Sequence, residues 1–337
     1  MIFTLSPVTA RHERSPCDIL GHAARERGNI VQTAFITHPA CLKHHMGGYH
    51  PESPARLAAI EDRLIAGGLF PLLQHHEAPR AGREQLARVH SLHYINKIEA
   101  ASPRQGITHL DADTAMNPYS LEAALRAAGA AVLGTDLVIG GKAENAFCNI
   151  RPPGHHATRD RAMGFCLFNN VAVGAAQALA VHGLERVAIA DFDVHHGNGT
   201  EDIFADDPRV MLCSTFQHPF YPHSGADSGN DHIINAPLPA GTNGIGFRAA
   251  VWERWLPALE AFRPQMLFIS AGFDAHGEDD MSGLALVEED YMWVTQKLKA
   301  VAQKWAEGRI VSVLEGGYAL DALGRSAAAH IKVLSGL

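Results

Sequence analysis

The chain has 337 residues, of which 47% are hydrophobic and 19% charged, and its formal net charge is −8. This composition supports a packed core and excludes a largely disordered chain. The acidic balance argues against direct nucleic-acid binding, since surfaces that bind nucleic acid are usually basic, and no apolar run approaches the length of a membrane span.

The first 30 residues are predicted to form an extension outside the folded domain. They lack the sustained apolar region of a signal peptide and the pattern of a strand or helix. We expect a disordered segment, with a surface-packed helix as the alternative, followed by one domain over residues 31–337. The five cysteines are scattered without CxxC spacing, which is typical of a reducing compartment and predicts a cytoplasmic protein.

From residue 33 onward, strand-like and helix-like stretches alternate. Short apolar runs predict buried parallel strands at residues 34–37, 146–150, 187–190, 210–214, 266–270 and 310–314. Alanine-rich amphipathic stretches predict helices near residues 54–66, 84–100, 119–139, 168–183, 247–261, 288–306 and 321–334. This alternation predicts an α/β fold, with one parallel sheet covered by helices on both faces.

Polar residues directly follow four of the predicted strands. They occupy glycine-containing segments at residues 151–156, 191–199, 271–276 and 315–318. Ligands of open parallel sheets bind outside the carboxyl ends of the strands. The four segments are therefore expected to meet at one edge of the sheet and to form a single site.

Carboxylates and an imidazole within these segments have the spacing of a metal site. Asp191, Asp193 and His195 alternate along an extended stretch, so Asp193 and His195 can reach one ion together. Asp274 can supply a third ligand from another strand end. Two carboxylates and one imidazole suit a hydrolytic Zn²⁺, with Fe²⁺ as the alternative, and leave a position open for water.

Each of these signals is weak when taken alone. Asp-x-Asp is common in ordinary turns, and the chain has four adjacent histidine pairs, at residues 44–45, 75–76, 155–156 and 195–196. The pair at 75–76 follows a predicted helix and is expected on the surface. The pair at 44–45 lies in a glycine-rich loop and is expected at a pocket rim or on the surface. Only the last two pairs follow buried strands.

The motifs together identify a family. The chain resembles the zinc-dependent histone deacetylases, with a pattern most similar to their class II and bacterial amidohydrolase branch, which is related to the acetylpolyamine amidohydrolases. Six ordered motifs carry the resemblance: HPESPARL at 50–57, RPPGHH at 151–156, GFCLFNN at 164–170, DFDVHHGNG at 191–199, SAGFD at 270–274 and LEGGY at 314–318. The resemblance implies the arginase–deacetylase fold, a single parallel sheet between layers of helices.

The resemblance also implies roles for the polar residues. The zinc ligands would be Asp193, His195 and Asp274. His155 and His156 would be the paired catalytic histidines, and Tyr318 would polarise the acetyl carbonyl. Asp191 would orient His155, and Asn198 would face His156.

Further roles implied by the resemblance concern a second ion and the channel. Asp191 and Ser214, with nearby main-chain carbonyls, would bind a structural K⁺. Phe165 and Tyr221 would form opposite walls of the acyl channel. Arg56 and His50 would lie near the pocket without an assigned role. The segments at residues 217–225 and 276–281 depart from the family pattern and are expected to border the channel mouth.

The reaction that this set of residues predicts is hydrolysis of an acetylated amine. Zinc can polarise an amide carbonyl and lower the pKa of bound water, and His156 can act as general base and acid. Three substrates fit the sequence: acetyl-lysine side chains, acetylated polyamines and small acyl amines. A binuclear manganese ureohydrolase and an inactive binding module are the competing classes. The first needs additional carboxylates, and the second should have lost a ligand or the tyrosine.

Overall fold

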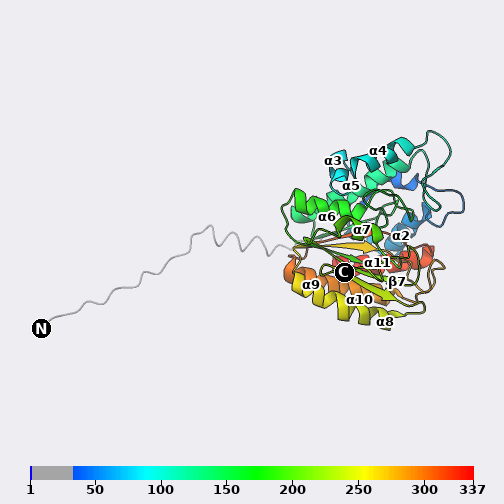
Figure 1. Ribbon diagram of the computed structural model, residues 1–337. Helices are drawn as coiled ribbons and strands as arrows, with labels where there is room; N and C mark the ends of the chain where they lie inside the picture. The colour runs from blue at the N-terminus through cyan, green and yellow to red at the C-terminus, as the bar shows by residue number, and fades with distance from the viewer. Residues whose placement is uncertain (2–32) are drawn as a thin grey trace. The chain divides into compact units, whose positions relative to one another are not determined.

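An eight-stranded sheet runs through the part of the chain that the structure, a computed structural model, describes: Met1 and residues 33–337 (Figure 1). The extension expected over residues 1–30 lies, apart from Met1, outside these residues. The strand order is β2-β1-β5-β10-β9-β6-β7-β8, and every pairing within this sheet is parallel. The predicted single parallel sheet is therefore confirmed.

The strands of the sheet are short, and the central ones are buried along their whole length. Their bounds are Thr33–Thr37 (β1), Gln74–Glu77 (β2), Asn145–Cys148 (β5), Val187–Asp191 (β6), Val210–Gln217 (β7), Ile233–Leu238 (β8), Met266–Ala271 (β9) and Ile310–Leu314 (β10). A separate antiparallel pair joins Thr108–His109 (β3) to Ala115–Met116 (β4). Apolar side chains on both faces bury these central strands, as parallel sheets require.

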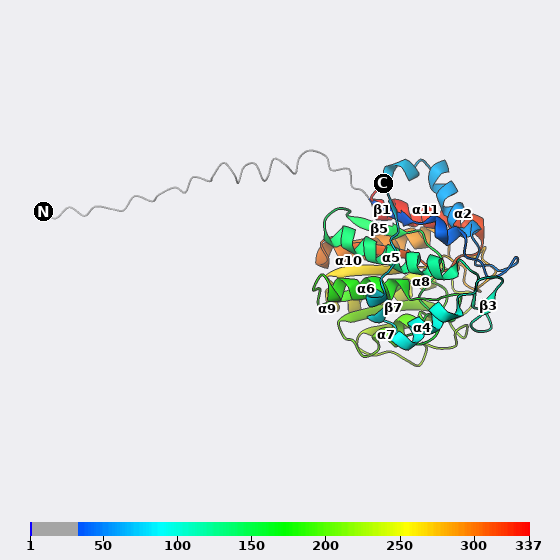
Figure 2. The ribbon, with the colours of Figure 1, turned by 90° about the horizontal axis from the view of Figure 1, so that it is seen from above.

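Helices cover both faces of the sheet (Figures 1 and 2). Ser120–Ile139 (α5) and Asn170–Ala180 (α6) pack on one face, and Glu288–Trp305 (α10) and Leu320–Ser335 (α11) on the other. Ala55–Ala66 (α2) packs against α11. The small residues of α5 allow close approach, since a Cβ at Gly134 would lie 3.2 Å from Val311 and 3.3 Å from Ala146.

The remaining helices differ from the predicted stretches in instructive ways. The stretch at 84–100 is two helices, Arg83–Ala87 (α3) and Leu92–Ala101 (α4), because the Ser91 hydroxyl accepts a hydrogen bond from the Tyr94 amide and starts a new helix. The stretch at 247–261 is Gly244–Ala250 (α8), a π-helical turn at Val251–Trp255 and Leu256–Phe262 (α9). The helix Asn198–Phe204 (α7) was not predicted. Within the described residues, no helix has the length and apolar character needed to cross a membrane.

Candidate active site

Four neighbouring strands carry the polar segments that the sequence singled out. β5, β10, β9 and β6 lie side by side in the middle of the sheet, so the loops that follow them open at the same edge. This confirms the predicted convergence of the four segments. The site follows from the parallel arrangement, because every strand delivers its carboxyl end to the same side.

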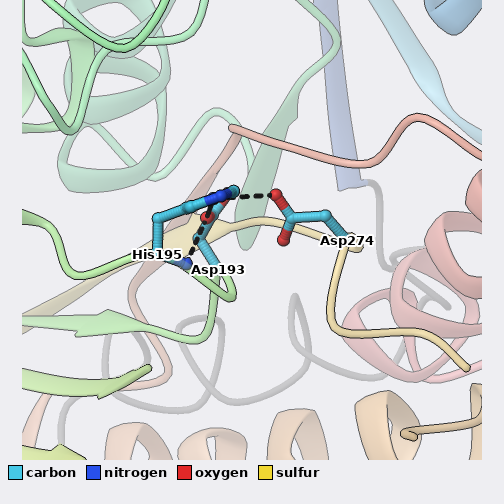
Figure 3. A group of neighbouring side chains, drawn as sticks. All are labelled: Asp193, His195 and Asp274. Carbon is cyan, nitrogen blue, oxygen red and sulfur yellow. Dashed lines mark hydrogen bonds and ion pairs between the residues drawn. The ribbon is translucent and has the colours of Figure 1, made fainter. Parts of the chain in front are cut away.

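Asp193, His195 and Asp274 form a compact, buried cluster (Figure 3). The ligand atoms of the three side chains all lie within 4.8 Å of one another. His195 Nδ1 is 2.9 Å from Asp193 Oδ1 and 3.3 Å from Asp274 Oδ2. The predicted trio therefore meets, from the loops after β6 and β9.

The surroundings of this cluster suit a divalent cation. Asp193 Oδ2 accepts a hydrogen bond from the Gly316 amide (2.8 Å), and Asp274 Oδ1 accepts one from the Val194 amide (2.9 Å). Asp274 Oδ2 is buried and makes no well-formed hydrogen bond, although His195 Nδ1 lies 3.3 Å away. Burial and the adjacent Asp193 carboxylate raise the pKa of Asp274 to about 6. Two buried carboxylates and one imidazole form a donor set suited to a metal. A divalent cation would neutralise the buried charges of the carboxylates.

Gly316 lies against the carboxylate cluster, where there is no space for a side chain. A Cβ at Gly316 would lie 2.0 Å from Asp274 Oδ2 and 2.5 Å from Asp193 Oδ2. Any side chain there would occupy the space between the two carboxylates. The loop after β10 can pass over the cluster only with glycine at this position.

The two histidines after β5 stand next to the cluster in contrasting environments. Their ring centroids are 4.0 Å apart. His155 Nδ1 lies 2.9 Å from Asp191 Oδ2, whereas His156 Nδ1 lies 2.7 Å from Asn198 Oδ1. Both expected partnerships are present in the structure.

The contrast between the partners separates the pKa values of the two histidines. Burial lowers the pKa of His155, but the carboxylates of Asp191 and Asp193 outweigh burial and raise it to about 10. Burial, followed by the charges of His155 and His195, holds the pKa of His156 well below 6.5. An acid–base pair with opposite shifts is typical of a catalytic site.

Glu315, part of the LEGGY motif but without a predicted role, holds the histidine loop in place. Its Oε2 accepts hydrogen bonds from the amides of Gly154 (2.7 Å) and His155 (3.1 Å), and Ser270 Oγ donates to Oε1 at 3.2 Å. Burial raises the pKa of this carboxyl to about 7. The side chain, at the start of the loop after β10, thus joins the loop after β5 to strand β9.

A cavity of about 240 Å³ opens above the cluster. His155, His156, His195 and Tyr318 line it, together with Phe165 and Tyr221 as expected. Asp113, Phe220 and Met281, none of which was predicted individually, also line it. The segments at 217–225 and 276–281, expected at the channel mouth, supply Phe220, Tyr221 and Met281. The sequence signal for these residues was therefore their departure from the family pattern.

Aromatic rings form the walls of the cavity. The rings of Phe165 and Tyr318 are perpendicular with centroids 6.0 Å apart, and Tyr221 meets His156 edge to face at 5.3 Å. Phe220 stacks on His195 at 5.4 Å. The result is a pocket that combines aromatic walls with a few polar side chains, the usual construction of a small-ligand site.

The Arg56 guanidinium packs against the ring of Tyr318. Its guanidinium lies 5.0 Å from the centre of the Tyr318 ring, and its Nε donates to the Gly317 carbonyl at 2.6 Å. Arg56 is fully buried and pairs with Glu52. His50 touches Phe165 at a centroid distance of 4.6 Å, so both residues lie near the pocket as expected.

The two residues expected to bind K⁺ lie opposite each other on adjacent strands. Asp191 and Ser214 are register partners of β6 and β7. Both are fully buried, and the Ser214 hydroxyl has no hydrogen-bond partner. A buried hydroxyl without a partner next to a carboxylate fits a cation site.

The expectation for the His44-His45 pair is wrong for its first member. His45 is exposed, but His44 is fully buried, with Nδ1 2.7 Å from Ser120 Oγ and Nε2 3.4 Å from Glu52. These partners are distant in sequence, so the loop alone could not reveal them. His75 is exposed as expected, whereas His76 is half-buried, and both lie on the edge strand β2.

Comparisons with known proteins identify the family and its fold. The family described as "Histone deacetylase domain" matches residues 50–334. The chain is 37% identical over 330 residues to the Histone deacetylase-like amidohydrolase of Pseudomonas aeruginosa, covering 91% of this chain and 87% of that protein. It is 35% identical over 355 residues to Type-2 histone deacetylase 2 of Dictyostelium discoideum, covering 91% of this chain but 21% of that longer protein. The crystal structure of the HDA15 HD domain matches with a TM-score of 0.84 at 34% identity, covering 90% of each chain.

Proposed function

Since the chain belongs to the histone deacetylase family and has its arginase–deacetylase fold, we propose that it is a zinc-dependent hydrolase that removes an acetyl group from an amine. The observation that carries this proposal is the meeting of three groups at one cavity: the Asp193, His195 and Asp274 cluster, the histidine pair and Tyr318. Together they provide a metal site, an acid–base group and an oxyanion donor.

The ligand cluster supports Zn²⁺, and Fe²⁺ is the alternative with the same ligand preferences. A zinc ion held by Asp193, His195 and Asp274 would supply Lewis-acid chemistry, polarising the acyl carbonyl and lowering the pKa of the attacking water toward about 7. The unpartnered Oδ2 of Asp274 is the atom that favours an ion there.

His156 is proposed as the general base and acid. Asn198 Oδ1 can only accept a hydrogen bond, and its Nδ2 points to Met163 Sδ at 3.4 Å, so Nδ1 of His156 carries the proton. The unprotonated Nε2 is then left for the cavity that the ring lines. From there it can accept a proton from water and later donate it to the departing amine, which would otherwise leave as an unstable anion.

His155 and Tyr318 complete the proposed mechanism. The Asp191 carboxylate accepts a hydrogen bond from His155 Nδ1. It thereby fixes the His155 ring beside His156, where His155 acts as an electrostatic partner. The Tyr318 hydroxyl would donate to the oxyanion that develops on the acetyl carbonyl, a contribution of about 10²–10³ in rate for one donor.

The competing classes lack support from the site. A binuclear ureohydrolase needs further carboxylates to bridge two metals, yet within residues 33–337 the acidic and histidine side chains form one such ligand group. Asn198, not a carboxylate, faces the histidine pair. An inactive binding module would have no need for the full set of ligands, histidines and tyrosine.

Acetyl-lysine in proteins and acetylated polyamines are the two substrate classes we propose. The carboxylate of Asp113 lines the cavity, which favours substrates that carry a positive charge beyond the acetyl group, as polyamines do. A zinc-replete assay of acetyl-lysine peptides and acetylpolyamines side by side tests the proposal. Hydrolysis of either class, lost on zinc chelation, is expected, and no hydrolysis of any acyl amine would contradict it.

We propose K⁺ as a second, structural ion at Asp191 and Ser214. The buried, unpartnered hydroxyl of Ser214 supports it. Because Asp191 also accepts a hydrogen bond from His155, this ion would help to hold His155 in position beside the general base.

A further inference from the structure

Asp279, in the loop after β9, connects two parts of the site through one carboxylate. It is 5% exposed. Its Oδ2 accepts hydrogen bonds from the amides of Tyr318 (2.6 Å) and Ala319 (3.0 Å), and its Oδ1 accepts one from the amide of Met281 (3.0 Å). Met281 and Tyr318 both line the cavity. One side chain therefore ties the rim of the cavity to the backbone of the tyrosine.

The backbone around Tyr318 needs an external support of this kind. Gly317 precedes it with φ +121°, a region in which glycine moves freely. Ala319, the residue at the start of α11, has no side-chain oxygen with which to cap the helix. Asp279 accepts from the amides of Tyr318 and Ala319, directly before the first residue of the helix, and its negative charge lies near the favourable end of the helix dipole.

We propose that Asp279 is a positioning residue for Tyr318, holding the tyrosine where its hydroxyl meets the developing oxyanion. This inference rests on the proposed function, in which Tyr318 is the oxyanion donor. Asp279 does not line the cavity, and of the residues bound by its side chain only Tyr318 has a proposed role in the reaction. Its contribution to the rate is therefore limited by what the tyrosine hydroxyl contributes.

A carboxylate that only stabilised the start of α11 would make the same contacts but would have different consequences when removed. Loss of a cap lowers stability wherever the helix lies and does not depend on the Tyr318 hydroxyl. Loss of a positioning residue matters only while the hydroxyl is present. A double-mutant cycle between the two residues separates these cases, because residues that act together have non-additive effects.

The experiment measures kcat and KM of the zinc-loaded full-length protein for the acetyl-lysine peptide or acetylpolyamine that the side-by-side assay finds to be hydrolysed. Four proteins are compared: wild type, Asp279→Ala, Tyr318→Phe and the double variant. Asp279→Ala is expected to lower kcat about 10-fold or more, within the 10²–10³ that one oxyanion donor provides. In the Tyr318→Phe background the same change should alter kcat by less than about two-fold. An equal fold-loss in both backgrounds, or unchanged kcat in Asp279→Ala, would overturn the inference.

Two further variants make the result decisive. Asp290→Ala removes a buried carboxylate that caps α10 through the Val287 amide (3.0 Å), away from the cavity, and should lower the melting temperature without changing kcat. Asp279→Asn serves if the alanine variant does not fold. Its single acceptor oxygen can serve Tyr318 and Ala319 or Met281, but not both sides, so a smaller loss with the same non-additivity is expected. Wild-type activity in Tyr318→Phe would instead refute the proposed function, and this inference with it.

Discussion

Replacement of Asn198 tests how the site selects the reactive form of His156. The imidazole has two neutral tautomers, and the 2.7 Å contact with Asn198 Oδ1 favours the one with the proton on Nδ1. Asn198→Ala leaves that N–H buried without a partner, at a cost of about 1–3 kcal/mol. The other tautomer, with Nε2 protonated and unable to act as a base, then becomes favoured by a similar amount. We expect kcat to fall by a factor of about 5–150.

Asn198→Asp is the matched control for that prediction. A carboxylate still accepts from Nδ1, so the tautomer is preserved and activity should return at high pH. Its charge also raises the pKa of His156, by about 1–3 units for a close pair. The acid limb of the pH–rate profile should therefore shift to higher pH. Steady-state kinetics between pH 6 and 9, with melting temperatures as a folding check, measure both effects. More than half of wild-type kcat in a folded Asn198→Ala variant would refute the reasoning.

Two other predictions concern the tyrosine and the core. Tyr318→Phe should keep bound zinc and KM but lower kcat by about 10²–10³, because the lost hydroxyl acts only in the transition state; steady-state kinetics with metal analysis checks this, and near-normal turnover would contradict it. His330 is buried between Thr295 and Ser312, and burial lowers its pKa to about 3. Below about pH 6.5 the unfolded chain therefore binds a proton at this residue that the folded state does not, so His330 contributes a fall in the unfolding free energy of about 1.4 kcal/mol per pH unit as the pH drops. His330→Gln should flatten this slope in urea titrations at pH 7 and pH 5, and an unchanged slope would show that His330 does not cause it.

The sequence was most informative where local pattern and chemistry coincide. Asp193 and His195 follow a fully buried strand with alternating spacing, so both the end of β6 and the shared side of the two ligands could be predicted. Asp274 follows β9 in the same way. The parallel sheet then brought these ends together without further information.

The remainder depended on contacts between distant segments. β2 has the sequence QHHE, which shows no apolar pattern because it is an edge strand paired only with β1. His44 is polar yet buried, since Ser120 and Glu52 satisfy it from elsewhere in the chain. Asp279 gave no local signal, because its partners Tyr318 and Ala319 lie 39 and 40 residues away.

Support for the reacting groups also follows a common principle that sequence spacing does not show. Glu315 accepts from the amides of the histidine loop, Asp279 from those of the tyrosine, and Asp191 from the His155 ring. In each case a buried carboxylate fixes a group that faces the cavity. Catalysis by preorganised polar groups requires such a supporting layer.

The most direct test of the account is the zinc content of the purified protein, measured by elemental analysis alongside its deacetylation rate. The wild type, loaded with zinc and desalted, should hold one zinc per chain at the Asp193, His195 and Asp274 cluster. Asp274→Ala leaves two of three ligands and should lose nearly all bound zinc and all activity, while Asp290→Ala, far from the cluster, should lose neither. Full zinc content with wild-type activity in Asp274→Ala would contradict the account.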